Sequence, residues 1–242
     1  MTIYNITTGQ NIIDVSSDGV VTCLKIRKPI AVDWYDRAGS VGKYYAGTTD
    51  FKPITQNFND ALEHRTDAQI MQVMQDFMPL FANGHYVVSI GKATETDYEL
   101  HSEFMEGKNR GSISYSYFCE PKLQLCFTQP LRKMSQERIM FYEQIIAKGA
   151  RPKVLMLEAH YPDNKDKKNK RGYLLNSPQF VLDGHHKAVA YRNLNIDLEF
   201  VRISKQVLVA EIESNKDLYS KYEYFLTDHH KQHLARFLKP RL

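Results

Sequence analysis

Long apolar runs are absent from this sequence of 242 residues, and none approaches the length of about 20 that a membrane-spanning helix needs. The first residues contain neither the basic segment nor the apolar segment of a secretory signal peptide. Cysteine is scarce: Cys23, Cys119 and Cys126 are odd in number and lack Cys-x-x-Cys spacing, which favours free buried thiols. We therefore expect a soluble chain without a membrane span, located in the cytoplasm.

Several common catalytic motifs are also missing. There is no Gly-x-Ser-x-Gly nucleophile elbow, no zincin motif and no Gly-x-Gly-x-x-Gly fingerprint. The segment from Arg37 to Tyr44 has the Gly-Lys pair of a phosphate-binding P-loop but lacks its first glycine and its magnesium-binding Ser or Thr, so we expect a flexible loop. His229 and His233 have the i, i+4 spacing of a helical metal pair, but no third ligand accompanies them, so we predict no metal site.

Charge of one sign is not in large excess. The net charge is +4, with 43% hydrophobic and 25% charged residues, which is typical of an ordinary globular protein. This balance permits an anionic ligand, whereas strongly basic DNA-binding proteins carry a denser footprint of Lys and Arg. The length allows one large domain or two small ones.

The first half of the sequence has the pattern of strands. Apolar residues alternate on both sides of Pro29, which should mark an edge or a bend. A helix with an apolar stripe follows, and its start is marked by a capping box between Thr66 and Gln69. Over 85–129 the alternation returns in about four strands separated by turn residues, which predicts an antiparallel meander. We therefore expect residues 1–129 to form a β-rich N-terminal region.

The second half alternates helices and strands. A helix over 135–148 precedes a strand over 153–158, and a second strand ends at Asp183 before a short helix and another strand. The last forty residues or so have helical periodicity. We therefore expect residues 130–242 to form a second unit with C-terminal helices, packed with the first in an α+β fold.

The stretch from Pro178 to Ala190 is the one around which we expect the chain to be organised. An apolar strand passes through Asp183 and Gly184 into a helix, and the free N–H groups and the dipole of a helix N-terminus attract anions. Three side chains suited to phosphate or proton chemistry follow the glycine, namely His185, His186 and Lys187. The plainer interpretation is an Asp-Gly turn followed by exposed polar residues.

The order of elements around this turn resembles that of the ParB/sulfiredoxin-like superfamily. The resemblance covers about 136–203, and the Asp-Gly-His-His-Lys form at 183–187 looks most like uncharacterised and kinase-like branches, including archaeal free-serine kinases. Sulfiredoxin has cysteine where this chain has His185, so sulfinic acid reduction is not expected. ParB partition proteins have Glu-Arg-Arg at 185–187, and the loss of two guanidinium groups argues against a CTP clamp.

The resemblance implies a protein that binds a nucleotide or a small phosphorylated ligand. ATP or another nucleotide, with Mg²⁺, is the expected cofactor, and phosphotransfer or nucleotide hydrolysis, as in a kinase or NTPase, stays open. Backbone N–H groups from Gly184 to His186 would hold a phosphate, and Lys187 would neutralise its charge. His186 would donate a hydrogen bond to the phosphate, and His185 would face the acceptor. Asp183 would accept a proton or bind magnesium.

The neighbouring strand offers a second carboxylate for the same role, Glu158, followed by His160. The charged loop from Asp163 to Arg171 is either a solvated hairpin loop or a basic flap over an anionic ligand. It would join two strands that end beside Gly184, and could therefore reach a ligand there. Two other functions stay open, a DNA-associated ParB-like nuclease or regulator and a non-catalytic interaction module. Neither oligomeric state nor substrate follows from the sequence.

Overall fold

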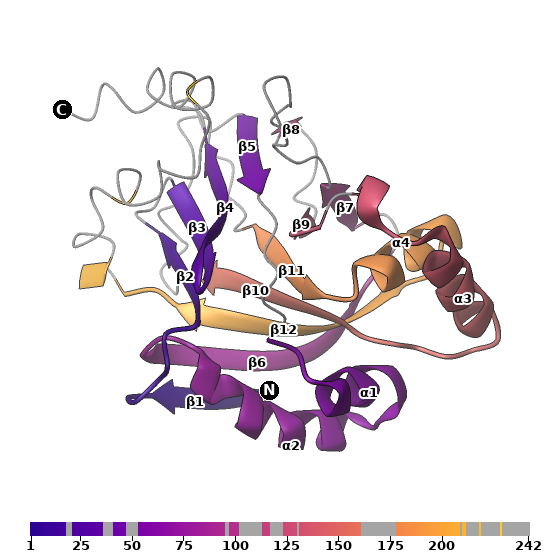
Figure 1. The fold of residues 1–242 in the computed structure, drawn as a ribbon, viewed down its shortest axis with the longest axis horizontal. Helices are drawn as coiled ribbons and strands as arrows, with labels where there is room; N and C mark the ends of the chain where they lie inside the picture. The colour runs from indigo at the N-terminus through magenta and orange to yellow at the C-terminus, as the bar shows by residue number, and fades with distance from the viewer. Residues whose placement is uncertain are drawn as a thin grey trace.

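The computed structural model of the chain has an α+β fold, as predicted, with strands in two sheets and helices below and to the right of them in the view of Figure 1. It describes residues 1–17, 21–35, 41–46, 53–94, 97–101, 113–116, 123–129, 131–160, 178–208, 210–211, 218 and 228. Within these residues, no helix has both the length and the apolar character required to cross a membrane.

The larger sheet has seven strands and mixes parallel with antiparallel pairs. Its order is β1 (Thr2–Ile6), β6 (Gly84–Ala93), β12 (Leu198–Gln206), β10 (Val154–His160), β11 (Gln179–Asp183), β9 (Leu123–Phe127) and β7 (Tyr98–His101). β10 is parallel to β12 and antiparallel to β11, while β9 is parallel to both of its neighbours. The middle of this sheet is buried, which fits the continuous apolar runs of its strands.

The smaller sheet has five antiparallel strands in the order β2 (Ile13–Ser17), β3 (Val21–Ile26), β4 (Lys28–Tyr35), β5 (Val41–Ala46) and β8 (Ile113–Ser116). Pro29 lies in β4, and the register against β3 shifts at Leu24 and Lys25, beside the proline that cannot donate a ladder hydrogen bond. The loop predicted over 37–44 is wrong for its second part, since Val41 to Tyr44 belong to β5 and pair with β8. Residues 36–40 lie outside the described residues.

The predicted meander over 85–129 is also wrong in its pairing. Four strands do form there, but β6 pairs with β1 and β12, β8 belongs to the smaller sheet, and β7 and β9 are parallel neighbours. Alternation shows which residues of a strand share a face, but it does not identify the partner strand. The larger sheet therefore takes strands from both sides of residue 129, where the sequence had suggested a boundary.

The helices and short 3₁₀ turns gather beside the larger sheet (Figure 1). They are α1 (Gln56–His64), α2 (Asp67–Phe77), η1 (Met78–Leu80), η2 (Leu131–Lys133), α3 (Gln136–Ala147) and α4 (His185–Asn193). The predicted capping box is confirmed at α2, where Thr66 and Gln69 exchange hydrogen bonds, and the apolar stripe from Ile70 to Phe77 is buried. α3 packs against α4, and Leu62 at the end of α1 accepts a hydrogen bond from the N–H of Lys153 before β10.

Candidate functional site

The turn between β11 and α4 has the predicted geometry. Phe180 and Val181 are fully buried in β11, and α4 begins at His185 directly after the turn. Gly184 is the N-cap, with φ 89° in the left-handed region, and no side chain caps the helix. A Cβ at this position would lie 3.1 Å from the Cα of Val154, so the turn is packed against the start of β10. This arrangement leaves the start of α4 without a capping side chain in a turn that favours glycine.

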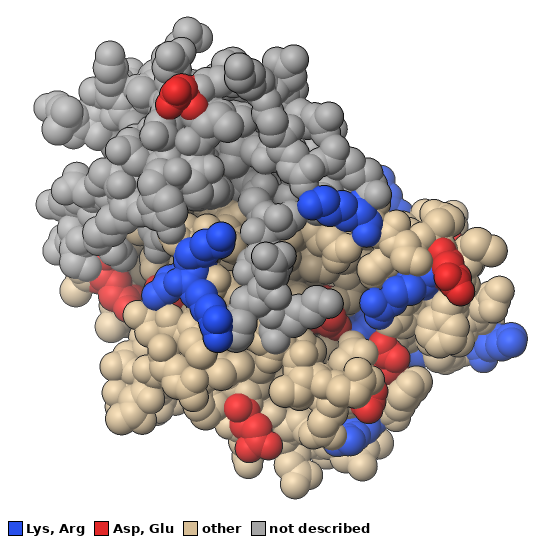
Figure 2. All heavy atoms as spheres, in the orientation of Figure 1, with Lys and Arg blue, Asp and Glu red and all other residues tan. Residues whose placement is uncertain are grey.

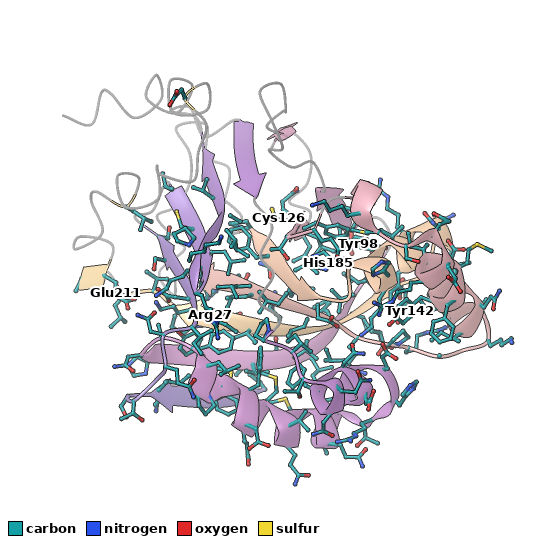
Figure 3. All side chains as sticks on the ribbon, viewed as in Figure 1. Arg27, Tyr98, Cys126, Tyr142, His185 and Glu211 are labelled. Atoms are coloured by element: carbon teal, nitrogen blue, oxygen red, sulfur yellow. The ribbon has the colours of Figure 1, made fainter. Side chains whose placement is uncertain are left out.

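His185 is a buried part of this turn rather than an exposed one. The backbone N–H of Thr128 donates to its Nε2 at 3.1 Å, and its ring meets that of Phe127 edge to face at 5.1 Å. Because Nε2 accepts a hydrogen bond, the neutral ring carries its proton on Nδ1. Burial lowers the pKa of His185 to about 4, so the ring is neutral at pH 7. Figure 3 labels it beside the end of β11, at the start of α4. Its predicted role toward an acceptor stays a prediction.

His186 joins the starts of two helices. The backbone N–H of Ser135 donates to its Nε2 at 3.1 Å, and Ser135 is the N-cap of α3, whose Oγ accepts from the N–H of Arg138. The pKa of His186 is lowered first by its burial and then by the charge of Arg138, which is itself exposed. The N-termini of α3 and α4 therefore lie side by side, with a guanidinium near both.

Lys187 is almost completely buried, with 1% of its side chain exposed. Its ammonium lies 3.2 Å from Oδ2 of Asp183, one turn earlier in the chain. Asp183 has 27% of its side chain exposed and is the member of this pair that reaches solvent. A direct contact between Lys187 and a phosphate stays a prediction, and the shortest contact of its ammonium in the structure is the one with Asp183.

No family model, curated protein or solved structure matches the chain. The resemblance to the ParB/sulfiredoxin-like superfamily therefore stays a prediction carried by the turn and its order of elements.

Helix α1 brings residues to the site that the sequence had not suggested. Asn59 Oδ1 lies 3.4 Å and Glu63 Oε1 3.6 Å from Nζ of Lys187. The hydroxyl of Tyr142, from α3, donates to Glu63, and its ring face lies 5.8 Å from the same ammonium. Figure 3 shows Tyr142 on the side of α3 that faces the rest of the molecule. Burial, and then the hydrogen bond to Glu63, raise the pKa of this phenol. Asp183 and Lys187 thus meet α1 and α3 in one polar cluster.

Glu158 is not part of this cluster. β10 and β11 are antiparallel, so Asp183 pairs with Leu155 near the start of β10, while Glu158 lies near its end and bonds to Gln179 at the start of β11. Glu158 also accepts from Ser204 Oγ at 2.5 Å, which ties β10, β11 and β12 together. The structure therefore gives this carboxylate buried partners away from Gly184.

The basic loop predicted over 163–171 lies outside the described residues. β10 ends at His160 and β11 begins at Gln179. Because the two strands are antiparallel, these two strand ends lie at the end of the sheet away from Gly184. The expectation that the two strands end beside the glycine is wrong, because β10 and β11 are antiparallel and the end of β11 lies beside the start of β10.

Metal ligands are sparse at the site. Among the described residues, no three His, Cys, Asp or Glu side chains come close enough to hold a metal ion. Mg²⁺, however, is often held by one carboxylate together with the phosphates of a substrate, and the partly exposed Asp183 fits that limited role. His229 and His233 lie outside the described residues.

Proposed function

We propose that the chain binds a phosphate group, most simply that of a nucleotide such as ATP, at the N-terminus of α4. The observation that carries the proposal is the N-cap of this nine-residue helix: a left-handed glycine with no capping side chain, directly after the partly exposed Asp183. The first N–H groups of a helix lack intrahelical acceptors, and the helix dipole stabilises an anion at this end.

Two neighbouring features support an anionic ligand. The N-terminus of α3 adds a second dipole of the same sense through the contact between His186 and Ser135. Arg138 is exposed at that point, and its charge already acts on His186. A guanidinium can form two parallel hydrogen bonds with phosphate oxygens. The positive partial charges of two helices and one full charge therefore surround the same place.

Asp183 gives this place a chemical function beyond binding. Its carboxylate is held by Lys187 on one side and is partly exposed on the other. A carboxylate fixed beside a bound phosphate can accept the proton of an attacking hydroxyl group or hold Mg²⁺ against phosphate oxygens. Phosphotransfer or nucleotide hydrolysis is thus the reaction class we propose. Mg²⁺ would neutralise phosphate charge, and the chain's own residues would position the phosphate and receive the proton.

A role in binding duplex DNA is less well supported. On the face drawn in Figure 2, basic and acidic side chains are interspersed over the described residues, without a continuous basic field. Binding to a DNA backbone depends on many phosphate contacts from Lys and Arg. A single phosphate position at one helix N-terminus suits a small ligand better.

The test is isothermal titration of the full chain with ATP, ADP and inorganic phosphate, with and without Mg²⁺. Arg138→Gln, which removes an exposed charge, should lower the affinity about tenfold, the scale of one charge-assisted hydrogen bond. Arg192→Gln is the matched control, because Arg192 is exposed in the last turn of the same helix, and its affinity should equal that of the parent. The proposal is wrong if none of these compounds binds the parent at millimolar concentration. It is also wrong if Arg138→Gln and Arg192→Gln bind with the same affinity.

A further inference from the structure

A buried ammonium with several acceptors lies directly behind the proposed phosphate position. Nζ of Lys187 has three oxygen neighbours within 3.6 Å, from Asp183, Asn59 and Glu63. The oxygen of Asp183 comes from the end of β11, directly before the helix that contains Lys187. The other two come from α1, which belongs to the N-terminal half of the chain. A charge this deeply buried is stable only when it is paired and hydrogen-bonded.

Glu63 is the most constrained member of this group. Its Oε1 accepts hydrogen bonds from the Tyr142 hydroxyl and from Nδ2 of Asn59, the latter at 3.3 Å. Only 12% of its side chain is exposed. Glu63 therefore has a fixed position, set by α3 and α1, from which it attracts the ammonium of Lys187.

Asp183 is the member that differs from the others. It is the most exposed of the three charged groups, at 27% against 12% for Glu63 and 1% for Lys187. One of its oxygens, Oδ2, accepts from the ammonium. A carboxylate on a partly exposed side chain rotates about its own bonds unless a fixed donor holds one oxygen. The buried lysine supplies that donor.

We infer that Lys187 and Glu63 are positioning residues for Asp183, so that α1 completes the site from the other half of the chain. Glu63 fixes the ammonium, and the ammonium fixes the carboxylate beside the start of α4. This inference rests on the proposed function and extends it, because it assigns Lys187 to the carboxylate rather than to the phosphate. It also explains why a cation so close to the phosphate position is shielded from solvent.

The two assignments of Lys187 predict opposite results for Lys187→Met, which keeps the chain length and removes the charge. If Lys187 contacts the phosphate, the affinity for inorganic phosphate should fall about tenfold, as for Arg138→Gln. If it positions Asp183, the affinity should stay within about twofold of the parent. Isothermal titration of the full chain with inorganic phosphate separates these outcomes.

A second measurement follows Asp183 itself and needs no ligand. In protein with ¹³C-labelled aspartate, the Cγ signal of Asp183 is assigned by its loss in Asp183→Asn. At pH 7 this signal should move in Lys187→Met and in Glu63→Gln, which removes the charge of Glu63 but keeps its shape. Glu143→Gln is the control, since Glu143 bonds to Asn193 at the other end of α4, and it should leave the signal in place.

The outcomes separate this inference from the proposed function. A tenfold loss of phosphate affinity in Lys187→Met, or an unmoved Asp183 signal in Glu63→Gln, overturns the positioning role and leaves phosphate binding intact. Failure of the parent to bind any phosphate compound overturns the proposed function, while the Asp183 signal still decides whether Lys187 and Glu63 position the carboxylate. If Lys187→Met does not fold, Glu63→Gln carries the test by itself.

Discussion

Single residues of the α4 turn have roles that differ sharply despite being adjacent in sequence. His185 supports the fold as a neutral ring, His186 links two helix starts, and Lys187 is enclosed with carboxylates. Gly184 before them provides the left-handed turn. Consecutive polar residues therefore have different roles: His185 belongs to the interior, and His186 and Lys187 belong to the proposed site.

The buried imidazole of His185 predicts a specific sensitivity to acid. Burial lowers its pKa from 6.5 to about 4, so the unfolded chain takes up this proton at a higher pH than the native chain does. The native state therefore loses stability as the pH falls from about 6.5 to about 4, by on the order of 3 kcal/mol in total. Urea unfolding between pH 7 and pH 4 should show a shallower loss in His185→Gln than in the parent. His64→Gln, at a side chain that is 66% exposed, should follow the parent.

Two glycines with positive φ allow the turn to be tested against its packing. Gly184→Ala combines a left-handed φ with a Cβ 3.1 Å from the backbone of Val154, whereas Gly149→Ala has a φ of 101° and nothing within 4 Å. We expect Gly149→Ala to cost about 1 kcal/mol from the backbone alone and Gly184→Ala at least about 2 kcal/mol, since it adds a close contact. Chemical denaturation of both variants measures the difference. Equal costs would show that the turn can relax away from β10.

At the scale of elements, α1 joins the two halves of the chain at the site. Its start is fixed by Thr55, whose side chain accepts from the N–H of Phe58, and its buried face is formed by Phe58, Ala61 and Leu62. The flank of the same short helix, next to its buried face, supplies Asn59 and Glu63 to Lys187. Packing of the buried face therefore determines where these polar side chains point.

Loss of the α1 cap should be measurable without altering the site chemistry. Thr55→Ala removes the acceptor for one of the first N–H groups of the helix, which typically costs about 1 kcal/mol. We expect a lower urea midpoint with an unchanged dependence of the unfolding free energy on urea concentration. The polar cluster around Lys187 should stay intact in the folded molecules. Thr55→Ser keeps the hydroxyl and should recover most of the loss. If Thr55→Ala has full stability, packing alone holds α1.

Much of the second half could be predicted because local signals there agree with the fold. The apolar run before Asp183, the glycine and the helix-forming residues after it specify a strand, a turn and a helix in that order. The partners of that turn could not be predicted. Glu63 and Tyr142 lie far from Lys187 in sequence, and nothing in their own surroundings signals the contact.

α1 itself did have a signal that could have revealed it. Phe58, Ala61 and Leu62 have i, i+3, i+4 spacing after Thr55, a short helix with a cap. The strand partners had no comparable signal, because alternation in 85–129 leaves neighbours undetermined. Glu158 was placed wrongly for the same reason, since the direction of β10 relative to β11 is a property of the assembled sheet.

At the scale of the whole molecule, the two halves share one sheet and one core. β12 pairs along its length with β6, and β11 pairs with β9, so strands from 1–129 flank β12, β10 and β11 on both sides. Most of the buried apolar residues of both halves belong to a single cluster. Neither half has a complete set of neighbours for its own strands.

Separation of the chain at residue 129 should therefore abolish folding of both pieces. A fragment of residues 130–242 would expose both outer edges of its three buried strands, and it should show no cooperative urea transition by circular dichroism. The full chain is the control and should unfold in one transition. A fragment with its own sharp transition would contradict the single shared core.

The pairing of β6 with β12 also governs the order of events during synthesis. His85 lies opposite Gln206, so β6 emerges from the ribosome long before the strand that covers its inner edge. Until then β6 can pair with β1 alone, and its other row of N–H and C=O groups stays open. The nascent chain therefore carries an unpaired strand edge from the synthesis of β6 until β12 is made, which is about half of its length, and we expect chaperones that shield this edge to raise its yield in cells.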